Sequence, residues 1–493
     1  WDDHDRSERR TANSMGKMYL DSCDPNAILF TIGDNDTFAL WYQQNIEQYR
    51  QDVRIVNTSL FQTDWYIDDM KKQAFESAPI PSQLTHEQYR YGVRDVIAYQ
   101  ETLKDTIDIE TWMNFVASED RRFKVELNSG QFINAFPSKV VRIPVDKEAV
   151  LANGIVAPED ADLIVPFIDI ELSGDFIYKN RILMLDIIAN NNWERPIYFS
   201  GGAFGDDDYL WMKDYLQLDG MAYKLVPIKT PVDPRNPYQM GRINSDKMFD
   251  IVMDWDWGGS GNPAIYHDTE TRRNGITYRS NLARLADQLI QERKFDRAET
   301  ILDLGMEKMP VDLFEYYSLL DPFVWNYYEI GALEKARLVF EQTAQKHREY
   351  LVYYGQMTLQ DQLDNIEEIY SKMNQYEGLV LLVNTFDQAS YYQMTKTRFI
   401  NDVSGFRNLF ERVGLDLEEE FLQASQVTLK NSISKLSDIE LKKKMMAKIN
   451  KDFLLKVIDP PFVPEFKSKP SRAIICILGF MLGIIISLVL IFI

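Results

Sequence analysis

The sequence predicts an α/β domain with a parallel-type sheet, followed by an α-helical repeat domain and a C-terminal transmembrane helix. Three observations support this fold class. Apolar runs alternate with amphipathic stretches near the start of the chain, and small and apolar residues recur at helical spacing after residue 278. The stretch from Ala473 to Ile493 carries no charged residue, so it is apolar enough to cross a bilayer.

Residues 1–225 are predicted to form the α/β domain. After residue 26 an apolar run and an amphipathic stretch follow each other twice, as AILFTI, TFALWYQQNIEQYR, VRIVNTSLF and DWYIDDMKK. This order is typical of β-α-β-α with parallel strands. Further along, RILMLDIIANNN predicts a helix, and residues 196–200 predict a further strand of the same sheet, ended by two glycines.

Two irregular segments interrupt this pattern. An insertion at about 77–179 contains several prolines and short alternating segments such as KVVRIPVD, which favour small strands and loops over long helices. Residues 226–277 are rich in Pro, Gly and Asn, as in KTPVDPRNPYQMG and DWDWGGSGNP. We expect them to form an irregular connector.

Residues 278–415 are predicted to be a helical domain. Apolar residues fall on one face of RSNLARLADQLIQ and on another of FDRAETILDLGMEKMP, and a second copy aligns Ala336 with Ala298. Small residues at these positions let two helices pack closely. The pattern resembles tetratricopeptide repeats, although its period exceeds their usual length of about 34 residues.

The C-terminal part is expected to lead into a membrane. Residues 416–458 read as amphipathic helices, 459–472 as a Pro-rich basic linker, and 473–493 as the transmembrane helix. Gly479 and Gly483 form a GxxxG pair, a spacing that lets two such helices associate, so a homo-oligomer through this helix is a candidate partner arrangement. Glycine pairs are also frequent in membrane helices without any such role.

The composition excludes several classes of function. The formal net charge is −21, so the soluble part should be repelled by nucleic acid, and we expect no nucleic-acid partner. Only two cysteines occur, and one of them lies in the predicted membrane segment, so no disulfide is expected. The chain opens on WDDHDRSERR without a signal segment, and we expect it to continue a longer polypeptide.

The hexapeptide GDNDTF follows the first predicted strand and opens a predicted helix. In α/β sheets this is the place where ligands bind. Asp34 and Asp36 are candidates for holding a divalent cation or sugar hydroxyls, with Asn35 adding an amide. Trp41 and Tyr42 are candidates for a stacking face. The alternative is a tight turn in which Asp36 or Thr37 caps the helix.

The pentapeptide QTDWY follows the second predicted strand in the same way. Thr63 or Asp64 can cap the next helix, which Trp65 begins. Because parallel strands end at one edge, Asp64 is expected near Asp34 and Asp36. The ligand-binding candidates are therefore Asp34, Asn35, Asp36, Trp41, Tyr42, Asp64 and Trp65.

Other polar clusters give weaker signals. WDDHDRS contains four adjacent residues of metal-binding types, but they cannot all face one ion, and a solvated linker is the alternative. GDDDY and MDWDWGG have polar loops as their default interpretation. The histidines lack HxxxH or HExxH spacing, and no GxSxG occurs, so the sequence assigns no catalytic residue and no cofactor beyond the candidate cation.

Five segments together resemble a known family. They are WDDHDRS at 1–7, GDNDTF at 33–38, QTDWY at 62–66, ERPIYFS at 194–200, and the helical repeat from residue 279. They resemble the extracytoplasmic C-terminal part of a bacterial multi-spanning membrane family related to protein O-mannosyltransferases, over roughly residues 1–415. One departure is Ala39, where the resemblance leads us to expect proline. The resemblance implies a glycosyltransferase-C-type membrane half, which holds the catalytic residue and is absent from these 493 residues.

A second resemblance covers the C-terminal end. VIDPPFVPEFKSKPSR and the apolar run after it resemble the end of polysaccharide chain-length regulators, the polysaccharide co-polymerases. Both resemblances imply a soluble part outside the cytoplasmic membrane, in the periplasm, and anchored to the inner membrane. The basic residues before the apolar run argue for the opposite orientation by the positive-inside rule.

Three functions follow as hypotheses. The preferred one is a membrane-anchored accessory domain that binds a glycan or an acceptor protein for a glycosyltransferase system. The second is a chain-length regulator or scaffold that acts by oligomerisation. The third is a metal-dependent sugar-processing enzyme that uses Asp34 and Asp36.

Overall fold

The computed structural model describes residues 8–102, 106–126, 130, 132–201, 209–232, 240–414 and 421. The chain divides into two units, residues 1–429 and 430–493, and every described residue lies in the first. The WDDHDRS segment, the linker at 459–472, the transmembrane helix and its Gly479–Gly483 pair therefore lie outside the described residues, as do the helices expected at 416–458 apart from Phe421. What the sequence predicts for these segments stays a prediction. Within the described ranges, no helix combines the length and apolar character that a bilayer crossing needs.

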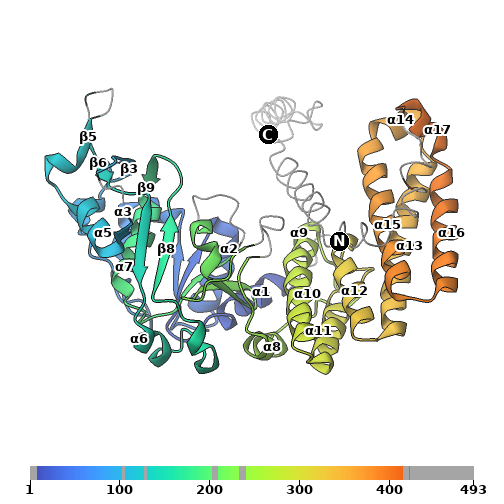
Figure 1. Ribbon diagram of the computed structural model, residues 1–493, viewed down its shortest axis with the longest axis horizontal. Helices are drawn as coiled ribbons and strands as arrows, with labels where there is room; N and C mark the ends of the chain where they lie inside the picture. The colour runs from blue at the N-terminus through green and yellow to red at the C-terminus, as the bar shows by residue number, and fades with distance from the viewer. Residues whose placement is uncertain are drawn as a thin grey trace, which may run out of the picture. The chain divides into compact units, whose positions relative to one another are not determined.

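A five-stranded sheet forms the centre of the α/β region (Figure 1). Its strand order is β11-β12-β10-β1-β2. Its strands are β1 (Ile28–Thr31), β2 (Arg54–Asn57), β10 (Ile197–Phe199), β11 (Leu216–Asp219) and β12 (Ala222–Leu225). β1 pairs in parallel with β2 and β10, which confirms the parallel strands that the sequence predicts. The sheet as a whole is mixed, because the hairpin β11–β12 adds an antiparallel edge to β10.

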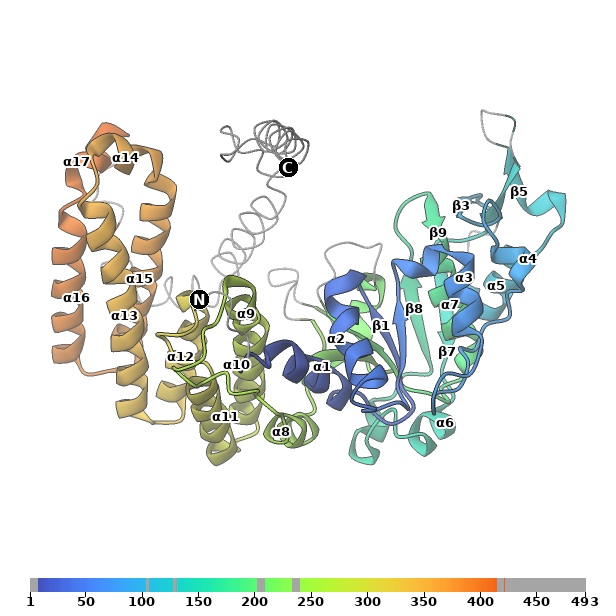
Figure 2. The same ribbon diagram turned by 180° about the vertical axis from the view of Figure 1, so that it is seen from behind.

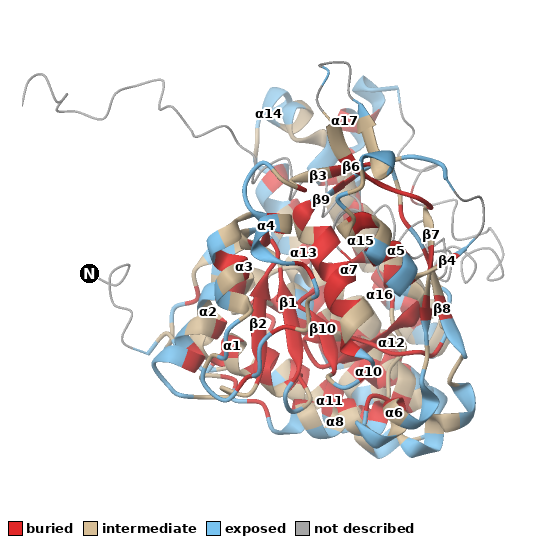
Figure 3. Cartoon of the chain, turned by 90° about the vertical axis from the view of Figure 1, so that its left-hand side faces the viewer, coloured by how far each residue is buried: buried red, intermediate tan, exposed pale blue. Residues whose placement is uncertain are grey.

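Helices cover both faces of this sheet (Figure 3). On one face lie α1 (Thr11–Asp21) and α2 (Gly33–Asn45). On the other lies α7 (Lys179–Asn191), which is the helix predicted from RILMLDIIANNN and shares a core with Ile28 and Phe30 of β1. Side chains alternate between faces along a strand, so Leu29 and Tyr198 face the opposite way from these residues. α7 is buried over most of its length because the insertion covers its outer side.

The insertion folds into two small sheets with short helices around them. One sheet has the order β5-β6-β3-β9 and the other β4-β7-β8. Their strands are β3 (Val96–Tyr99), β4 (Ile107–Asp108), β5 (Lys124–Glu126), β6 (Phe132–Phe136), β7 (Val140–Pro144), β8 (Phe167–Glu171) and β9 (Phe176–Tyr178). The short helices of the insertion are α4 (His86–Tyr89), α5 (Ile109–Ala117), α6 (Lys147–Ala152), η2 (Arg121–Phe123) and η3 (Pro158–Leu163). Outside it, η1 (Leu60–Gln62) and α3 (Asp64–Met70) follow β2, and η4 (Leu210–Tyr215) precedes β11.

The segment predicted to be irregular contains two helices, α8 (Ser245–Met253) and α9 (Thr269–Arg273). The Asn244 side chain caps α8 by accepting a hydrogen bond from the Lys247 N–H, and Met248 and Val252 bury one face of the helix. An Asn cap followed by apolar residues four apart is a helix signal. Because proline and glycine are abundant on both sides of α8, the sequence predicted an irregular segment instead of a helix.

A helical region follows, as predicted (Figure 2). Its helices are α10 (Gly275–Gln291), α11 (Phe295–Lys308), η5 (Tyr317–Leu320), α12 (Asp321–Glu329), α13 (Leu333–Gly355), α14 (Leu359–Asp364), α15 (Ile366–Phe386), α16 (Ala389–Ser404) and α17 (Arg407–Arg412). α10 packs on α11, α12 on α13, and α15 on α16. Ala298 and Ala336 are fully buried. The likeness of these helix pairs to tetratricopeptide repeats stays a prediction.

Helix α2 has an unusual distribution of polarity. Its buried face carries Thr37, Gln43 and Gln44 beside a single apolar residue, Leu40, while Phe38 and Tyr42 are exposed. The Gln43 amide donates a hydrogen bond to the Asn13 carbonyl, and the Gln44 amide donates to the carbonyls of residues 50 and 53. These hydrogen bonds, and not an apolar stripe, fix which side of α2 faces the protein.

The closest approach of α1 to α2 is at Gly16. A Cβ atom placed on Gly16 would lie 2.8 Å from the carbonyl oxygen of Ala39, closer than real Cβ contacts come. Because that oxygen belongs to helix backbone, it cannot move aside as a flexible side chain would. We therefore predict that Gly16→Val destabilises the protein by about 1–3 kcal/mol.

Thermal unfolding checks this prediction, with Gly378→Ala as the control. Gly378 lies in α15, and a Cβ atom added there would contact nothing within 4 Å. Alanine is a better helix former than glycine, so the control should be neutral or stabilising by up to about 1 kcal/mol. An unchanged melting temperature for Gly16→Val would show that the two helices separate without cost.

A buried histidine lies in the helical region. His347 of α13 is fully buried, and among the described residues neither ring nitrogen has a hydrogen-bond partner. The rings of Tyr317 and Tyr376 lie 6.2 Å and 6.3 Å from its ring. Burial and, to a smaller extent, the charge of Lys372 together lower the pKa of His347 from 6.5 to about 3.

We predict that this histidine makes stability depend on pH below neutrality. As pH falls through about 6.5 the unfolded chain gains a proton that the folded chain does not take up until about pH 3, so the free energy of unfolding falls by up to about 1.4 kcal/mol per pH unit across that window. Above pH 6.5 the contribution vanishes. Denaturant titrations of wild type and His347→Phe should diverge between these limits, and parallel curves would contradict the prediction.

Candidate functional site

The order of the strands creates a topological switch point between β1 and β10. From β1 the chain continues through α2 to β2 on one side, and it returns through α7 to β10 on the other side of β1. In open α/β sheets, ligands bind outside the carboxyl ends of the strands at such a point. Two segments meet there, Gly33–Asp36 after β1 and Ser200–Gly201 after β10. We call them the switch-point edge.

Asp36 joins the two segments of the switch-point edge. Its carboxylate accepts a hydrogen bond from the Ser200 hydroxyl, with 2.7 Å between the oxygens, and another from the backbone N–H of Ile32. Burial raises the pKa of Asp36, and these two hydrogen bonds offset part of that rise. The site therefore presents a partly buried carboxyl group next to a hydroxyl.

GDNDTF is not the capping turn that the sequence left open as an alternative. Helix α2 begins at Gly33, with Ile32 as the residue before it, and no side chain caps it. Asp36 and Thr37 therefore lie inside the helix. The Thr37 hydroxyl donates to the Gly33 carbonyl at 2.7 Å, and the Asn57 amide donates to the same carbonyl at 3.1 Å. Ala39 likewise lies beyond the first turn, where a proline would interrupt the helix.

The strand ends are tied together beneath the edge. The hydroxyls of Thr31 and Thr37 lie 2.7 Å apart, and the Asn57 amide donates to the Thr37 hydroxyl at 2.9 Å. Thr58 donates through its hydroxyl and its backbone N–H to the Thr31 carbonyl. These contacts hold α2 at the ends of β1 and β2, so the start of the helix is rigidly placed.

The other predicted residues of α2 lie on its outer side. Asp34 and Asn35 are exposed, Trp41 is half-buried, and Tyr42 is exposed with its hydroxyl donating to the Glu47 carboxylate. Phe38, which the sequence did not single out, is 54% exposed, and its ring lies 5.6 Å from that of Trp41. Together Phe38, Trp41 and Tyr42 form an aromatic face that adjoins the switch-point edge on the same helix.

Asp64 makes different contacts from Asp36. It begins α3, and its two carboxylate oxygens accept hydrogen bonds from the backbone N–H groups of Trp65 and Tyr91. Trp65 is 55% exposed. Within the described part of the chain, no hydrogen bond or ion pair joins Asp64 to Asp36, and no group of three or more His, Cys, Asp or Glu side chains is placed to hold a metal ion.

The sequence missed Ser200, Thr31 and Asn57. Each follows or ends a strand of the central sheet, as GDNDTF and QTDWY do. The signal for Ser200 was the SGG that ends the apolar run IYF. Its pairing with Asp36, 164 positions away in the sequence, required the order of the strands and could not be derived from spacing.

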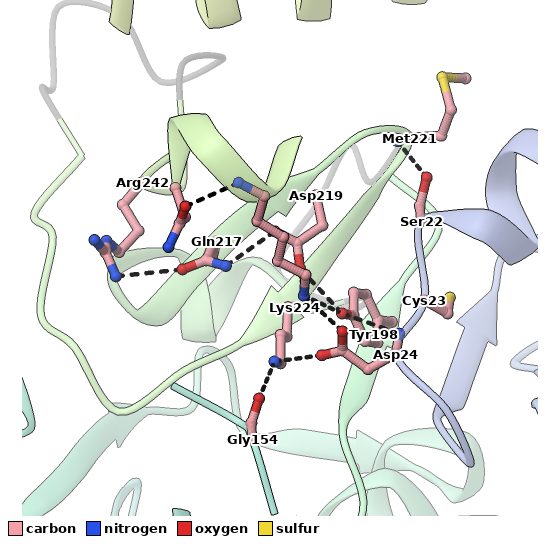
Figure 4. A network of polar contacts seen from close by, with 12 residues as sticks. Ser22, Cys23, Asp24, Gly154, Tyr198, Gln217, Asp219, Met221, Lys224 and Arg242 are labelled. Atoms are coloured by element: carbon pink, nitrogen blue, oxygen red, sulfur yellow. Dashed lines mark hydrogen bonds and ion pairs between the residues drawn. The ribbon is translucent and has the colours of Figure 1, made fainter. Parts of the chain in front are cut away.

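A buried network of charges lies on the α1 and α8 side of the sheet (Figure 4). Asp24, between α1 and β1, forms ion pairs with Lys224 of β12 and Lys247 of α8. Lys247 also contacts Asp219 of β11 at 2.6 Å, and the Tyr198 hydroxyl donates to the same carboxylate at 3.0 Å. Lys224 further donates to the carbonyl of Gly154 after α6. Asp219 and Lys224 are fully buried, and Asp24 and Lys247 are partly buried. We call these four residues the buried quartet.

The buried quartet is a structural feature. Its two carboxylates and two ammonium groups balance, and they tie together elements far apart in the sequence. Burial alone would raise the pKa of Asp24, but Lys224 and Lys247 outweigh it and lower that pKa to about 2. Cys23 next to it has a thiol whose pKa is raised by burial, which makes it a poor nucleophile.

We predict that Lys247→Met destabilises the protein by about 3–5 kcal/mol, because it leaves Asp219 buried without its cation. Lys72→Met serves as the control, since Lys72 and its partner Asp69 are both more than half exposed. That change should leave stability close to that of the wild type, because solvent screens an exposed pair. Denaturant midpoints measure both, and equal effects would show that burial adds nothing to the pairing.

Asp24 makes the stability of the protein depend on pH in the acid range. Its pKa is lowered, whereas burial without a partner would raise it. Its folded pKa of about 2 lies below the unpaired value of 3.8, so its stabilising contribution is complete above about pH 4 and is lost as pH falls towards 2. We predict that Asp24→Asn removes this acid-dependent part of the unfolding free energy. Acid titration of both proteins, followed by circular dichroism, provides the measurement. A wild-type loss centred near pH 4 would contradict the low pKa.

Comparison with known proteins gives a family match within the α/β region. Residues 12–247 match the family model of TMEM260-associated domain 2, and TMEM260 is a family related to protein O-mannosyltransferases. The matched range runs from α1 into α8 and includes both the switch-point edge and the buried quartet. Neither the curated proteins nor the solved structures gave a match. The family match does not extend to the part that resembles chain-length regulators.

Proposed function

We propose that this chain is a membrane-anchored, extracytoplasmic accessory domain that binds a glycan or an acceptor protein for a glycosyltransferase-C-like system. The observation that carries the proposal is the Asp36–Ser200 pair at the switch point of a region that matches TMEM260-associated domain 2. The bond-making residues would lie in a separate membrane half. The periplasmic face of the inner membrane is the proposed location.

The groups at the switch-point edge suit the recognition of hydroxyls. The Asp36 carboxylate and the Ser200 hydroxyl can each accept a hydrogen bond, and the exposed Asn35 amide can donate one. The aromatic face of Phe38, Trp41 and Tyr42 offers apolar surface on the same helix. Polar groups at fixed positions beside aromatic surface are typical of small-molecule sites.

The contacts of Ser200 favour binding over catalysis. Its hydroxyl donates to a carboxylate, and a serine nucleophile is usually activated by a histidine. The helical region, with its predicted tetratricopeptide-like pairs, would add a surface for an acceptor protein. We therefore assign recognition to this chain and transfer of the sugar to its proposed partner.

We predict that Asp36→Asn weakens glycan binding by about ten- to a hundredfold, because a hydrogen bond to a charged group is lost. The fold should remain intact, since asparagine keeps an acceptor oxygen for the Ser200 hydroxyl or the Ile32 N–H. Calorimetric titration of the full chain with oligosaccharides of neutral hexoses measures the effect. Glu87→Gln, whose carboxylate is 79% exposed in α4, is the matched control and should bind as wild type does.

The aromatic part of the proposal has a separate pair of variants. Trp65→Ala tests the α3 side of the site, and Phe295→Ala removes a similarly exposed aromatic ring from α11 as its control. Unchanged glycan and acceptor binding in both Asp36→Asn and Trp65→Ala would remove the proposed site.

A further inference from the structure

A cavity of about 580 Å³ lies away from the switch-point edge, between the loop that follows α8 and the end of α11. Its lining includes Met253, Trp255, Asp256, Trp257, Asn262 and Glu307. Ligand pockets usually have volumes of about 300–1,000 Å³, so this cavity has room for a small ligand. It contains the MDWDWGG segment, for which the sequence predicted only a polar loop.

The loop that forms this cavity is held in one conformation. The Ser260 hydroxyl donates to the Lys308 carbonyl at 2.8 Å, and the Gly258 N–H donates to Asp256 at 2.9 Å. A Cβ atom on Gly261 would lie 2.3 Å from the Glu307 carbonyl oxygen, so only glycine fits against α11. The cavity wall is thus formed before any ligand arrives.

Aromatic rings lie behind the loop. Trp255 and Trp257 meet edge to face with their centres 5.5 Å apart, and Trp257 contacts Tyr278 of α10 at 5.4 Å. The indole N–H of Trp255 is buried and has no acceptor among the described residues. Trp255 and Trp257 both line the cavity, so their rings give it an aromatic wall.

The side chains at the rim are exposed and polar. Asp256 and Glu307 are 56% and 69% exposed. Each has a cation nearby, Lys17 at 3.7 Å from Asp256 and Lys308 at 2.6 Å from Glu307. These charges balance, so the rim favours a neutral ligand over an ion. The carboxylates and the exposed Asn262 amide can pair with hydroxyl groups, and Met253 adds exposed apolar surface.

We propose that this cavity binds a neutral hexose unit of a glycan, as a second subsite distinct from the switch-point edge. The choice of a glycan rests on the proposed function, whereas the cavity and its contacts do not. Two separated subsites on one chain would let it hold an extended glycan, or two glycans, at once.

The test titrates the full chain with methyl glycosides and disaccharides of neutral hexoses. Asp256→Asn and Glu307→Gln each remove a charge while keeping the size of the side chain, and asparagine can still accept the hydrogen bond of Gly258. We expect the double variant to bind about tenfold more weakly or not at all. Glu334→Gln, 89% exposed on α13, is the matched control and should leave binding unchanged.

Asp36→Asn distinguishes this inference from the proposed function. Binding that is lost in the Asp256/Glu307 double variant and kept in Asp36→Asn supports the cavity. Binding that is lost only in Asp36→Asn overturns the cavity and leaves the proposed function in place. Absence of hexose binding by the wild-type chain overturns the cavity as well, as does tighter binding of a basic peptide than of any hexose.

Discussion

The buried quartet is the interaction on which the α/β region depends. Its carboxylates and ammonium groups come from the segment before β1, from both strands of the β11–β12 hairpin, and from α8. A charge buried without its partner is strongly destabilising, so these four elements are stable only together. The antiparallel hairpin lies next to β10, and there Lys224 pairs with Asp24 and Asp219 pairs with Lys247.

Much of the α/β region could be predicted from its apolar runs. β1, β2, β10 and α7 are buried on both sides or nearly so, and such segments read clearly because burial demands continuous apolar sequence. The hairpin and α8 were not predicted. Lys224 and Asp219 interrupt the apolar pattern of the hairpin, and their burial is explained only by partners up to 200 positions away. A strand that buries polar residues lacks the apolar pattern from which strands are predicted.

The candidate site was also predicted only in part. The position of GDNDTF after a strand was enough to predict its place at the carboxyl edge, because that depends on local order alone. Which carboxylate faces which partner was beyond the sequence. Asp36 meets Ser200, while Asp64 turns to the backbone at Tyr91, so two motifs of similar composition make different contacts. The sequence predicted that GDNDTF opens a helix, but it did not predict the missing side-chain cap or the hydrogen bonds that Asn57 and Thr37 donate to the Gly33 carbonyl.

In helix α2, the residues that attach the helix to the protein and the aromatic residues exposed to solvent lie on different sides. Its inward side is held by the amides of Gln43 and Gln44, each matched to a particular backbone carbonyl, while Phe38 and Tyr42 contribute little to the core. The outward residues are therefore released from the demands of folding. Related chains could exchange them without having to re-evolve the scaffold. The outer face of α2 can therefore change quickly, while the inner face of the same helix is bound to change slowly.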